Sequence, residues 1–256
     1  MGRDPTERLR TMISSSDPFS DDDAPDASLR VVTIDGPAAS GKGTVARQLA
    51  DTLGWTLLNT GAMYRVVALA GMRRGLDLTD EDRLAALAGT LKARFEVGRA
   101  WLDDEDVTEP IHSIEVTRAT RHAADNLRVR AVLVGWQRRF ARCHHPIVTE
   151  GRDQGTVVFP NAPVKIYLTA DPAERARRRV AQFTRQGQTV DPAQVFADLL
   201  QRDREDESRP IGALKPAPDA LRVDTTNLAP REIVGDLAIL VRQRLGMSNA
   251  TSPKIM

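Results

Sequence analysis

The sequence predicts an α/β fold, in which a five-stranded parallel sheet carries helices on both faces. Short apolar runs alternate with longer stretches of helical character along most of the chain. This alternation is typical of a parallel sheet, because two parallel neighbours must be joined by a crossover connection that is usually a helix. The chain has 256 residues, of which 41% are hydrophobic and 28% are charged. It is therefore long enough to bury a core of this kind.

Five short apolar runs are the predicted strands of the sheet. They lie near residues 30–35, 55–59, 146–150, 164–169 and 220–224. The long gap between the second and third runs contains the segment "ARFEVGRAWLDDEDVTEP", in which apolar residues alternate with polar ones and Gly98 marks a turn. We therefore expect a small antiparallel insertion there, followed by helices.

The two ends of the chain are expected to lie outside the folded domain. Residues 1–28 contain three arginines and seven acidic residues in a polar, proline-bearing context. Such a segment buries too little apolar surface to offset the entropy lost on ordering, so it is predicted to be a disordered acidic tail. Residues 246–256 are similarly predicted to be a flexible tail. The folded domain is then expected to span residues 29–245.

Composition excludes several classes of protein. The 36 basic residues nearly balance the 35 acidic ones, so no overall charge indicates a nucleic-acid or membrane partner. No apolar run approaches the roughly 18 residues of a membrane span. The single cysteine, Cys143, excludes an internal disulfide framework and fits a reducing compartment. We expect a cytoplasmic monomer.

A phosphate-binding loop is predicted between the first strand and the first helix. The segment "GPAASGKGT" has the spacing G-x-x-x-x-G-K in the order strand, loop, helix. Its two glycines allow the backbone N–H groups to point inward, and its lysine, expected to be exposed, brings a full charge to the phosphates. An ordinary glycine-rich turn is the alternative, but a nucleoside triphosphate is favoured. The expected ATP-binding residues are Gly36, Pro37, Ala38, Ala39, Ser40, Gly41, Lys42, Gly43 and Thr44.

One position of the loop affects the expected metal site. Gly43 follows the lysine, where many such loops place the Ser or Thr that ligates Mg²⁺. We therefore expect no direct protein ligand and a Mg²⁺ ion held with ATP through waters, while Thr44 donates its hydroxyl to a phosphate. Asp35, at the end of the first strand, is either a partner of those waters or a turn residue that caps the loop.

Two further motifs follow the second and third strands. "NTGAMYR" places Thr60 to cap a helix that begins near Ala62, and "EGRDQGT" begins at Glu150. Loops at the carboxyl ends of parallel strands line the ligand crevice of an open α/β sheet. The arginines of the two motifs are therefore expected to converge beside the phosphate-binding loop, where each guanidinium can bind two oxygens of a second phosphate.

Taken together, these motifs resemble the bacterial cytidylate kinases, a family of P-loop nucleoside monophosphate kinases. The resemblance covers nearly all of residues 30–245 and rests on "IDGPAASGKGT", "TGAMYR", "EGRDQGTVVFPNAPVKIYLTA" and "RDREDESRP" in that order. It implies the P-loop NTPase fold and transfer of a phosphoryl group from ATP to CMP or dCMP. It also implies that the insertion, at about 84–128, binds the monophosphate and that a helical lid lies at about 175–209.

The resemblance implies a role for individual residues. It assigns Lys42 to the ATP phosphates, Arg65 and Arg152 to the phosphate of CMP, and Arg130 and Asp153 to the cytosine base. Lys42 and Arg152 are in addition expected to stabilise the charge of the transferring phosphoryl group, so we count them as catalytic.

The remaining assignments concern the ribose and the lid. The resemblance places Arg202 and Asp206 at the ribose, Arg209 near the transferred phosphoryl group and Thr60 at a position that shapes the acceptor site. The spacing i, i+4, i+7 predicts that the first two and Arg209 share one face of a helix. A solvated, salt-bridged face is the alternative for so charged a segment.

The segment "ERARRR" supplies further arginines. Arg175, Arg178 and Arg179 are expected on one side of a helix after the fourth strand. Arg178 or Arg179 is expected to face the transferred phosphoryl group, and Arg178 is counted as catalytic beside Arg209. One family position differs, because Arg121 stands where the family has a serine that helps bind the base. A guanidinium donates hydrogen bonds but cannot accept them, so the base contacts are expected to differ in detail.

Two other functions remain open. The chain could be a kinase for another monophosphate, such as UMP or AMP. It could also be a nucleotide-dependent switch that hydrolyses its nucleotide without transfer, although the N-K-x-D motif of guanine-specific switches is absent. A switch would not need so many arginines beyond the phosphate-binding loop.

Overall fold

The fold is built on a parallel sheet with the strand order β2-β6-β1-β7-β8. The computed structural model of the chain describes residues 28–96, 98–185 and 187–247. Each strand lies within one residue of its predicted range, so this part of the prediction is confirmed. The strands are β1 (Val31–Asp35), β2 (Thr56–Asn59), β6 (Ile147–Gly151), β7 (Val164–Thr169) and β8 (Leu221–Asp224). The predicted tails lie outside the described residues, apart from positions 28, 246 and 247.

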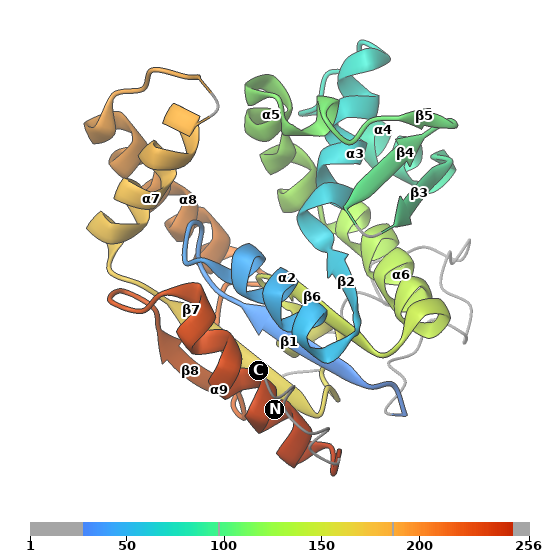
Figure 1. Cartoon of the computed structure of the whole chain (residues 1–256). Helices are drawn as coiled ribbons and strands as arrows, with labels where there is room; N and C mark the ends of the chain where they lie inside the picture. The colour runs from blue at the N-terminus through green and yellow to red at the C-terminus, as the bar shows by residue number, and fades with distance from the viewer. Residues whose placement is uncertain (1–27, 97, 186, 248–256) are drawn as a thin grey trace.

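Helices cover both faces of the sheet, as predicted (Figure 1). On one face lie α2 (Lys42–Leu53) and α9 (Pro230–Arg244), and on the other lie α3 (Thr60–Arg73) and α6 (Leu127–His144). Side chains of a strand point alternately to its two faces. Accordingly, Val32 packs in the cluster beneath α2 and α9, whereas its neighbour Val31 packs in the cluster of α3 and α6.

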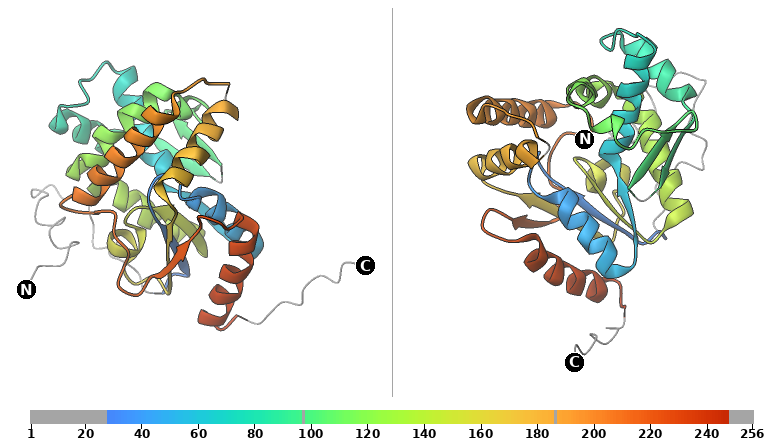
Figure 2. Two further views of the ribbon diagram at one scale, coloured as in Figure 1. Left: turned by 90° about the vertical axis from the view of Figure 1, so that its left-hand side faces the viewer. Right: turned by 45° about the horizontal axis from the view of Figure 1, so that its top comes forward.

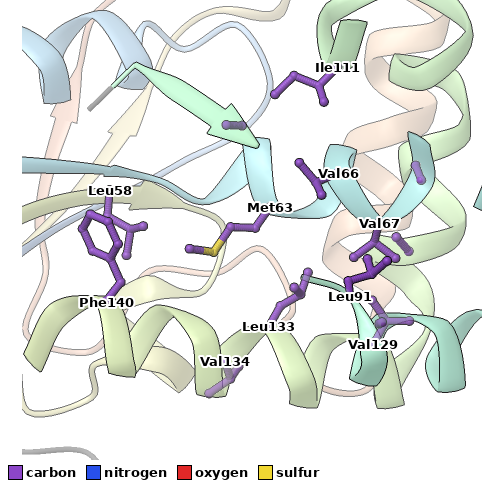
Figure 3. Packing of buried hydrophobic residues seen from close by; sticks show 14 of the residues in the cluster. Leu58, Met63, Val66, Val67, Leu91, Ile111, Val129, Leu133, Val134 and Phe140 are labelled. Carbon is purple, nitrogen blue, oxygen red and sulfur yellow. The ribbon is translucent and has the colours of Figure 1, made fainter. Parts of the chain in front are cut away.

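The larger of the two cores joins the sheet to an insertion between β2 and β6. Figure 3 shows Leu58 of β2 close to Phe140 of α6, and Met63 of α3 between the sheet and Leu133. All four side chains are at least nine-tenths buried. Burial of this apolar surface fixes how the insertion sits against the sheet.

The insertion contains a small antiparallel sheet with the order β3-β4-β5. Gly98, between its first two strands, has a φ of +75°, which favours glycine and explains the predicted turn. The elements of the insertion are α4 (Glu81–Thr90), β3 (Ala93–Glu96), β4 (Arg99–Leu102), β5 (Glu105–Asp106), η2 (Pro110–His112) and α5 (Ile114–Asp125).

Two helices form an arm after β7. They are α7 (Pro172–Arg185) and α8 (Pro192–Ser208), and both views of Figure 2 show them side by side. In Figure 1 this arm stands at the upper left and the insertion at the upper right, on either side of the end of the sheet where the loop between β1 and α2 lies. Within the described ranges, no helix combines the length and apolar character that crossing a membrane requires.

Candidate active site

The loop between β1 and α2 needs glycine at two positions. A Cβ on Gly36 would lie 2.2 Å from the backbone oxygen of Leu168, so no larger residue fits against β7. Gly41 is the N-cap of α2 and has a φ of +88°, a conformation that other residues rarely adopt. These two requirements explain the glycine spacing of the motif. The N-terminus of α2, with its partial positive charge, faces the end of this loop.

Three side-chain donors hold the carbonyl groups of the loop. Lys42 Nζ donates to Pro37 O at 2.9 Å, Arg175 Nη1 to Ala38 O at 3.2 Å, and Thr225 Oγ1 to Ser40 O at 3.0 Å. Arg175 and Thr225 belong to α7 and to the segment after β8. The loop is therefore held in shape partly by contacts to distant parts of the chain, and three of its carbonyl oxygens already accept hydrogen bonds.

Lys42 differs from its prediction because it is buried rather than exposed. It is the first residue of α2, and only 7% of its surface is accessible. The sequence-based expectation was wrong because the loop folds back toward the side chain, and the carbonyl oxygen of Pro37 accepts a hydrogen bond from its ammonium group. Burial, reinforced by the charge of Arg152, lowers the pKa of Lys42 to about 7.

A buried ion pair lies at the end of β6. Asp153 Oδ2 accepts a hydrogen bond from Arg130 Nη2 of α6, and both residues are less than 5% exposed. Arg130 also donates to Ala124 O at 3.1 Å and lies over the ring of Tyr64 at 5.9 Å from its centroid. The predicted pair of base-binding residues is thus adjacent, and one donor and one acceptor are fixed side by side.

Gly212 packs directly against this ion pair, which the sequence gave no reason to expect. It has a φ of +71°, and a Cβ there would lie 1.9 Å from Arg130 Nη2 and 2.5 Å from Asp153 Oδ2. The segment after α8 therefore closes one side of the pair, and only glycine allows this approach.

A group of cations lies between the phosphate-binding loop and the buried ion pair, and it consists of Arg65, Arg152, Arg179 and Arg202. Burial, together with the charges of Arg152, Arg65 and Arg179, lowers the pKa of Arg202 to about 10. Burial also lowers the pKa of Arg65, and burial with the charge of Arg65 lowers that of Arg179. Each guanidinium charge lowers the pKa of its neighbours, because like charges repel one another. An anion bound among them would relieve this repulsion, so the group forms a site for an anion.

Some of these charges are balanced by carboxylates. Arg152 Nε donates to Asp206 Oδ2 at 2.7 Å, and Arg209 Nη2 lies 2.6 Å from Asp206 Oδ1. Although burial raises it, these guanidinium charges leave the pKa of Asp206 below its usual value. The guanidinium group of Arg202, in contrast, makes no hydrogen bond or ion pair in the described part of the chain.

Arg209 lies beside Asp206 but not on its helix. The helix α8 ends at Ser208, and Arg209 is its C-cap with a ψ of 133°, so the predicted shared helical face is wrong for this residue. Pro210 follows, and a residue before proline is disfavoured in the helical conformation. The turned chain lets Arg209 Nε donate to Asp125 Oδ1 of α5 at 2.8 Å.

The three arginines of α7 face different partners. Arg175 is buried and bridges the phosphate-binding loop to Asp203. Arg178 donates to Glu174, to Thr225 O at 2.6 Å and to Thr226 O, and its Nη1 lies near Gly41. At i, i+3 and i+4 of α7 the three arginines lie on one side of the helix, as predicted, but they contact different partners.

Among these three, Arg179 is the one that belongs to the group of cations. Its pKa is lowered by burial and by Arg65, and its Nη1 donates only to Gln182 Oε1 in the described chain. Arg178, which the sequence favoured, is already engaged at the segment after β8. Arg121 is exposed on α5, one turn before Asp125.

Two residues near the end of β2 depart from expectation. The helix α3 begins at Thr60, and its N-cap is Asn59, whose side chain accepts from Ala62 N at 3.3 Å. Thr60 is not the cap, because its hydroxyl donates across the sheet to Glu150 O at 2.8 Å. Arg65 Nη1 lies 3.2 Å from His112 Nδ1 of η2, a contact between two distant segments.

Asp35 caps a loop, but not the phosphate-binding loop that follows it. Its two carboxylate oxygens accept from Gln154 N at 2.9 Å and Gly155 N at 2.8 Å. Burial raises the pKa of Asp35 to about 7 despite these two donors. Because Asp35 is also only 3% exposed, its carboxylate has little surface at which to contact the waters of a metal ion.

Glu150 lies close to the group of cations, although the sequence analysis gave it no role in the site. It is half-buried at the end of β6, next to β1, and its carboxylate has no hydrogen bond or ion pair in the described chain. Its charge acts on Lys42, Arg65 and Arg152. Its position at a strand end was a usable sequence indication, whereas Gly212 and His112 had none.

Comparison with known proteins gives a consistent family. The model of the family described as cytidylate kinase matches residues 32–243. The cytidylate kinase of Rhodopirellula baltica is 42% identical over 222 residues, which cover 87% of this chain and 96% of the relative. That of Colwellia psychrerythraea is 42% identical over 220 residues, covering 84% and 97%. That of Stutzerimonas stutzeri is 43% identical over 210 residues, covering 80% and 91%.

Proposed function

The chain belongs to the cytidylate kinase family, and from this premise we propose that it transfers the γ-phosphoryl group of ATP to CMP and to dCMP. The products are ADP and CDP or dCDP. The observation that carries the proposal is the group of cations between a phosphate-binding loop and a buried Arg130–Asp153 pair. Such a site suits two anionic substrates, one of which is recognised by its base.

The donor side of the proposed site is the loop of residues 36–44. Its backbone N–H groups and the N-terminus of α2 bind the ATP phosphates. Lys42 is held at Pro37 O, from where its flexible stem can move the ammonium group to the β- and γ-phosphates. The phosphates restore the full charge of Lys42, because a neighbouring anion raises the pKa that burial lowers. Thr44 is exposed at the end of the loop and supplies a hydroxyl.

The acceptor side binds the phosphate of CMP with Arg65 and Arg152, and Thr60 shapes the wall beside them. The ribose is held by Arg202 and Asp206. The balance of charge supports the role of Arg65, which has only an imidazole as a partner, whereas Arg152 already shares Asp206 with Arg209. A phosphate dianion would satisfy the guanidinium groups that lack a carboxylate.

The base is read by Asp153 and Arg130. Cytosine carries an exocyclic amine that donates a hydrogen bond, and its N3 and O2 accept. A carboxylate can accept from the amine, and a guanidinium can donate to N3 or O2. Uracil would direct a carbonyl oxygen toward the carboxylate, so CMP is preferred over UMP.

Catalysis consists of positioning and neutralisation of charge rather than of nucleophilic attack by the protein. Lys42, Arg152 and Arg209 supply positive charge to the transferring oxygens, together with an arginine of α7. Arg179 fits this last role better than Arg178, since Arg178 is held by two carbonyl groups and Glu174. Closure of the lid, at about 175–209, would exclude water that could hydrolyse ATP.

Mg²⁺ is the expected metal, and when bound it neutralises charge on the β- and γ-phosphates. The described residues contain no group of three His, Cys, Asp or Glu side chains that could hold a metal directly. Oxygen donors suit Mg²⁺, and Glu150 with the Thr44 hydroxyl fits contact through waters. Asp35 fits less well, because it is 3% exposed and both of its oxygens already accept backbone N–H groups. We further propose a monomer in the cytoplasm, which the single cysteine supports.

A coupled assay of ADP release tests this function. With ATP and Mg²⁺ fixed, ADP should form rapidly with CMP or dCMP, more slowly with UMP, and at background rate with AMP or without an acceptor. ADP release that does not depend on an acceptor would instead identify a nucleotide-hydrolysing switch. A preference for UMP or AMP would identify a different monophosphate kinase.

A further inference from the structure

A buried carboxylate links the two substrate-binding loops. Asp35 ends β1 and directly precedes Gly36 of the phosphate-binding loop. Asp35 is 3% exposed. One of its carboxylate oxygens accepts a hydrogen bond from Gln154 N, and the other accepts one from Gly155 N. These two amides follow Arg152 and Asp153 in the chain.

The segment of residues 151–155 is thereby tied to β1 at both ends. Gly151 is paired with Asp35 in the parallel ladder of β1 and β6, and the amides of Gln154 and Gly155 return to the side chain of the same aspartate. Arg152 and Asp153 lie between the two attachment points. The backbone of the two residues that meet the acceptor is therefore fixed relative to β1 by the strand ladder on one side and by the Asp35 carboxylate on the other.

We propose that Asp35 is a positioning residue for the acceptor, which sets Arg152 and Asp153 at the distance from the phosphate-binding loop that transfer requires. This inference rests on the proposed function of the site. It assigns to Asp35 a role through the acceptor loop and not through the metal ion.

The backbone of the donor loop does not share this dependence, although the charges of Asp35 and Lys42 interact. Its carbonyl groups are held by Lys42, Arg175 and Thr225, none of which contacts the Asp35 carboxylate through a hydrogen bond. Loss of the carboxylate should therefore loosen the acceptor loop while leaving the ATP-binding backbone in place. The two substrates respond differently to one change, which a general loss of stability would not produce.

Asp35→Asn tests the proposal with little change of volume. The amide oxygen can accept from one backbone N–H, but its NH₂ group would face the other N–H as a second donor. In the full-length chain we expect KM for CMP, and the dissociation constant of CMP measured calorimetrically without ATP, to rise about tenfold or more. KM for ATP should stay within about threefold of its original value, while kcat falls.

A matched control separates this effect from destabilisation. Val241→Ala removes two methyl groups from a fully buried side chain of α9, in the core that α9 forms with α2. It should lower the melting temperature without changing KM for either substrate. If Asp35→Asn does not fold, Gly155→Ala tests the same attachment, because its Cβ would lie 2.9 Å from Thr33 Oγ1 and displace the amide from Asp35.

The outcomes distinguish this inference from the proposed function. An unchanged KM for CMP in a folded Asp35→Asn variant, or equal rises for CMP and ATP, would overturn the positioning role. Failure of the unsubstituted chain to phosphorylate CMP would instead overturn the proposed function, and that result is obtained before any variant is measured.

Discussion

The proposed donor and acceptor sides of the site are built in opposite ways. The donor side consists of nine consecutive residues, Gly36 to Thr44, and acts mainly through backbone N–H groups and the end of a helix. The acceptor side combines side chains from α3, α6, α8 and the segment after β6. A site made by the backbone needs only glycines and a strand–helix context, whereas a site made by side chains needs several segments to meet.

The two sides also differ in how they manage charge. On the donor side, the ammonium group of Lys42 donates a hydrogen bond to the carbonyl oxygen of Pro37 at 2.9 Å. On the acceptor side, arginines are paired with Asp153 and Asp206, and Arg202 is left without a carboxylate in the described chain. Removal of a charge should therefore affect the donor side mainly through activity, and the acceptor side through both activity and stability.

The largest expected effect comes from Lys42→Met on the donor side. We expect kcat to fall by roughly a hundredfold or more, because one full positive charge is lost from the phosphates. The melting temperature should change by only a few degrees, since methionine fills the same space and a buried ammonium group with one hydrogen bond contributes little. Stopped-assay kinetics and thermal unfolding check this, and retained activity would contradict the role of the loop.

Asp153→Ala should break the acceptor side. Hydrogen bonds to charged groups contribute about 1.5 to 3 kcal/mol, so kcat/KM for CMP should fall roughly ten- to a hundredfold, and that for UMP much less. Because Arg130 would be left buried and unpaired, stability should also fall by about 3 to 5 kcal/mol.

UMP is the internal control for this variant. If Asp153 merely holds its loop through Arg130, both acceptors decline together, and base reading by Asp153 is refuted. The measurement is kcat/KM for both acceptors in both proteins, at a temperature where the variant is folded.

Gly212→Ala sharpens the comparison without removing a charge. The new Cβ would meet Arg130 Nη2 and Asp153 Oδ2, and the backbone there has a positive φ, so the pair must shift. We expect KM for CMP to rise by roughly fivefold and KM for ATP to stay unchanged. Gly246→Ala is a matched control, because that glycine has a φ of +59° but nothing near its Cβ. Equal effects of the two substitutions on CMP would argue against the contact.

The smallest effect is a pH dependence of stability on the donor side. The pKa of Lys42 is about 7 in the folded chain, against 10.5 as its ordinary value. Between these values the unfolded chain binds the additional proton, so the contribution of Lys42 to stability rises with pH across this window. The melting temperature of the unsubstituted chain should therefore rise relative to that of Lys42→Met from pH 7 to pH 10. A constant difference would show that the pKa is not lowered.

Local features of this chain could be predicted because their causes are local. The five strands, the turn at Gly98 and the phosphate-binding loop depend on hydrophobic pattern and on glycines within a few residues. The pairing of Arg130 with Asp153 is different, since only the family resemblance placed these residues together. The structure brings them into contact because α6 packs against η3 (Gln154–Val158), the segment that directly follows Asp153.

By itself, the sequence determined the order of the strands along the chain, the loop that binds phosphate and the family. The tertiary structure decided what each charged side chain meets. Thr60 lost its expected capping role because Glu150 O lies across the sheet, and Arg209 left the helix of Asp206 to reach Asp125. Lys42 became buried, and Gly212 closed on a pair 59 residues away from its nearer member. Hydrogen bonds and charges act over a few ångströms in space, whatever the separation along the chain, so these partners follow only from packing.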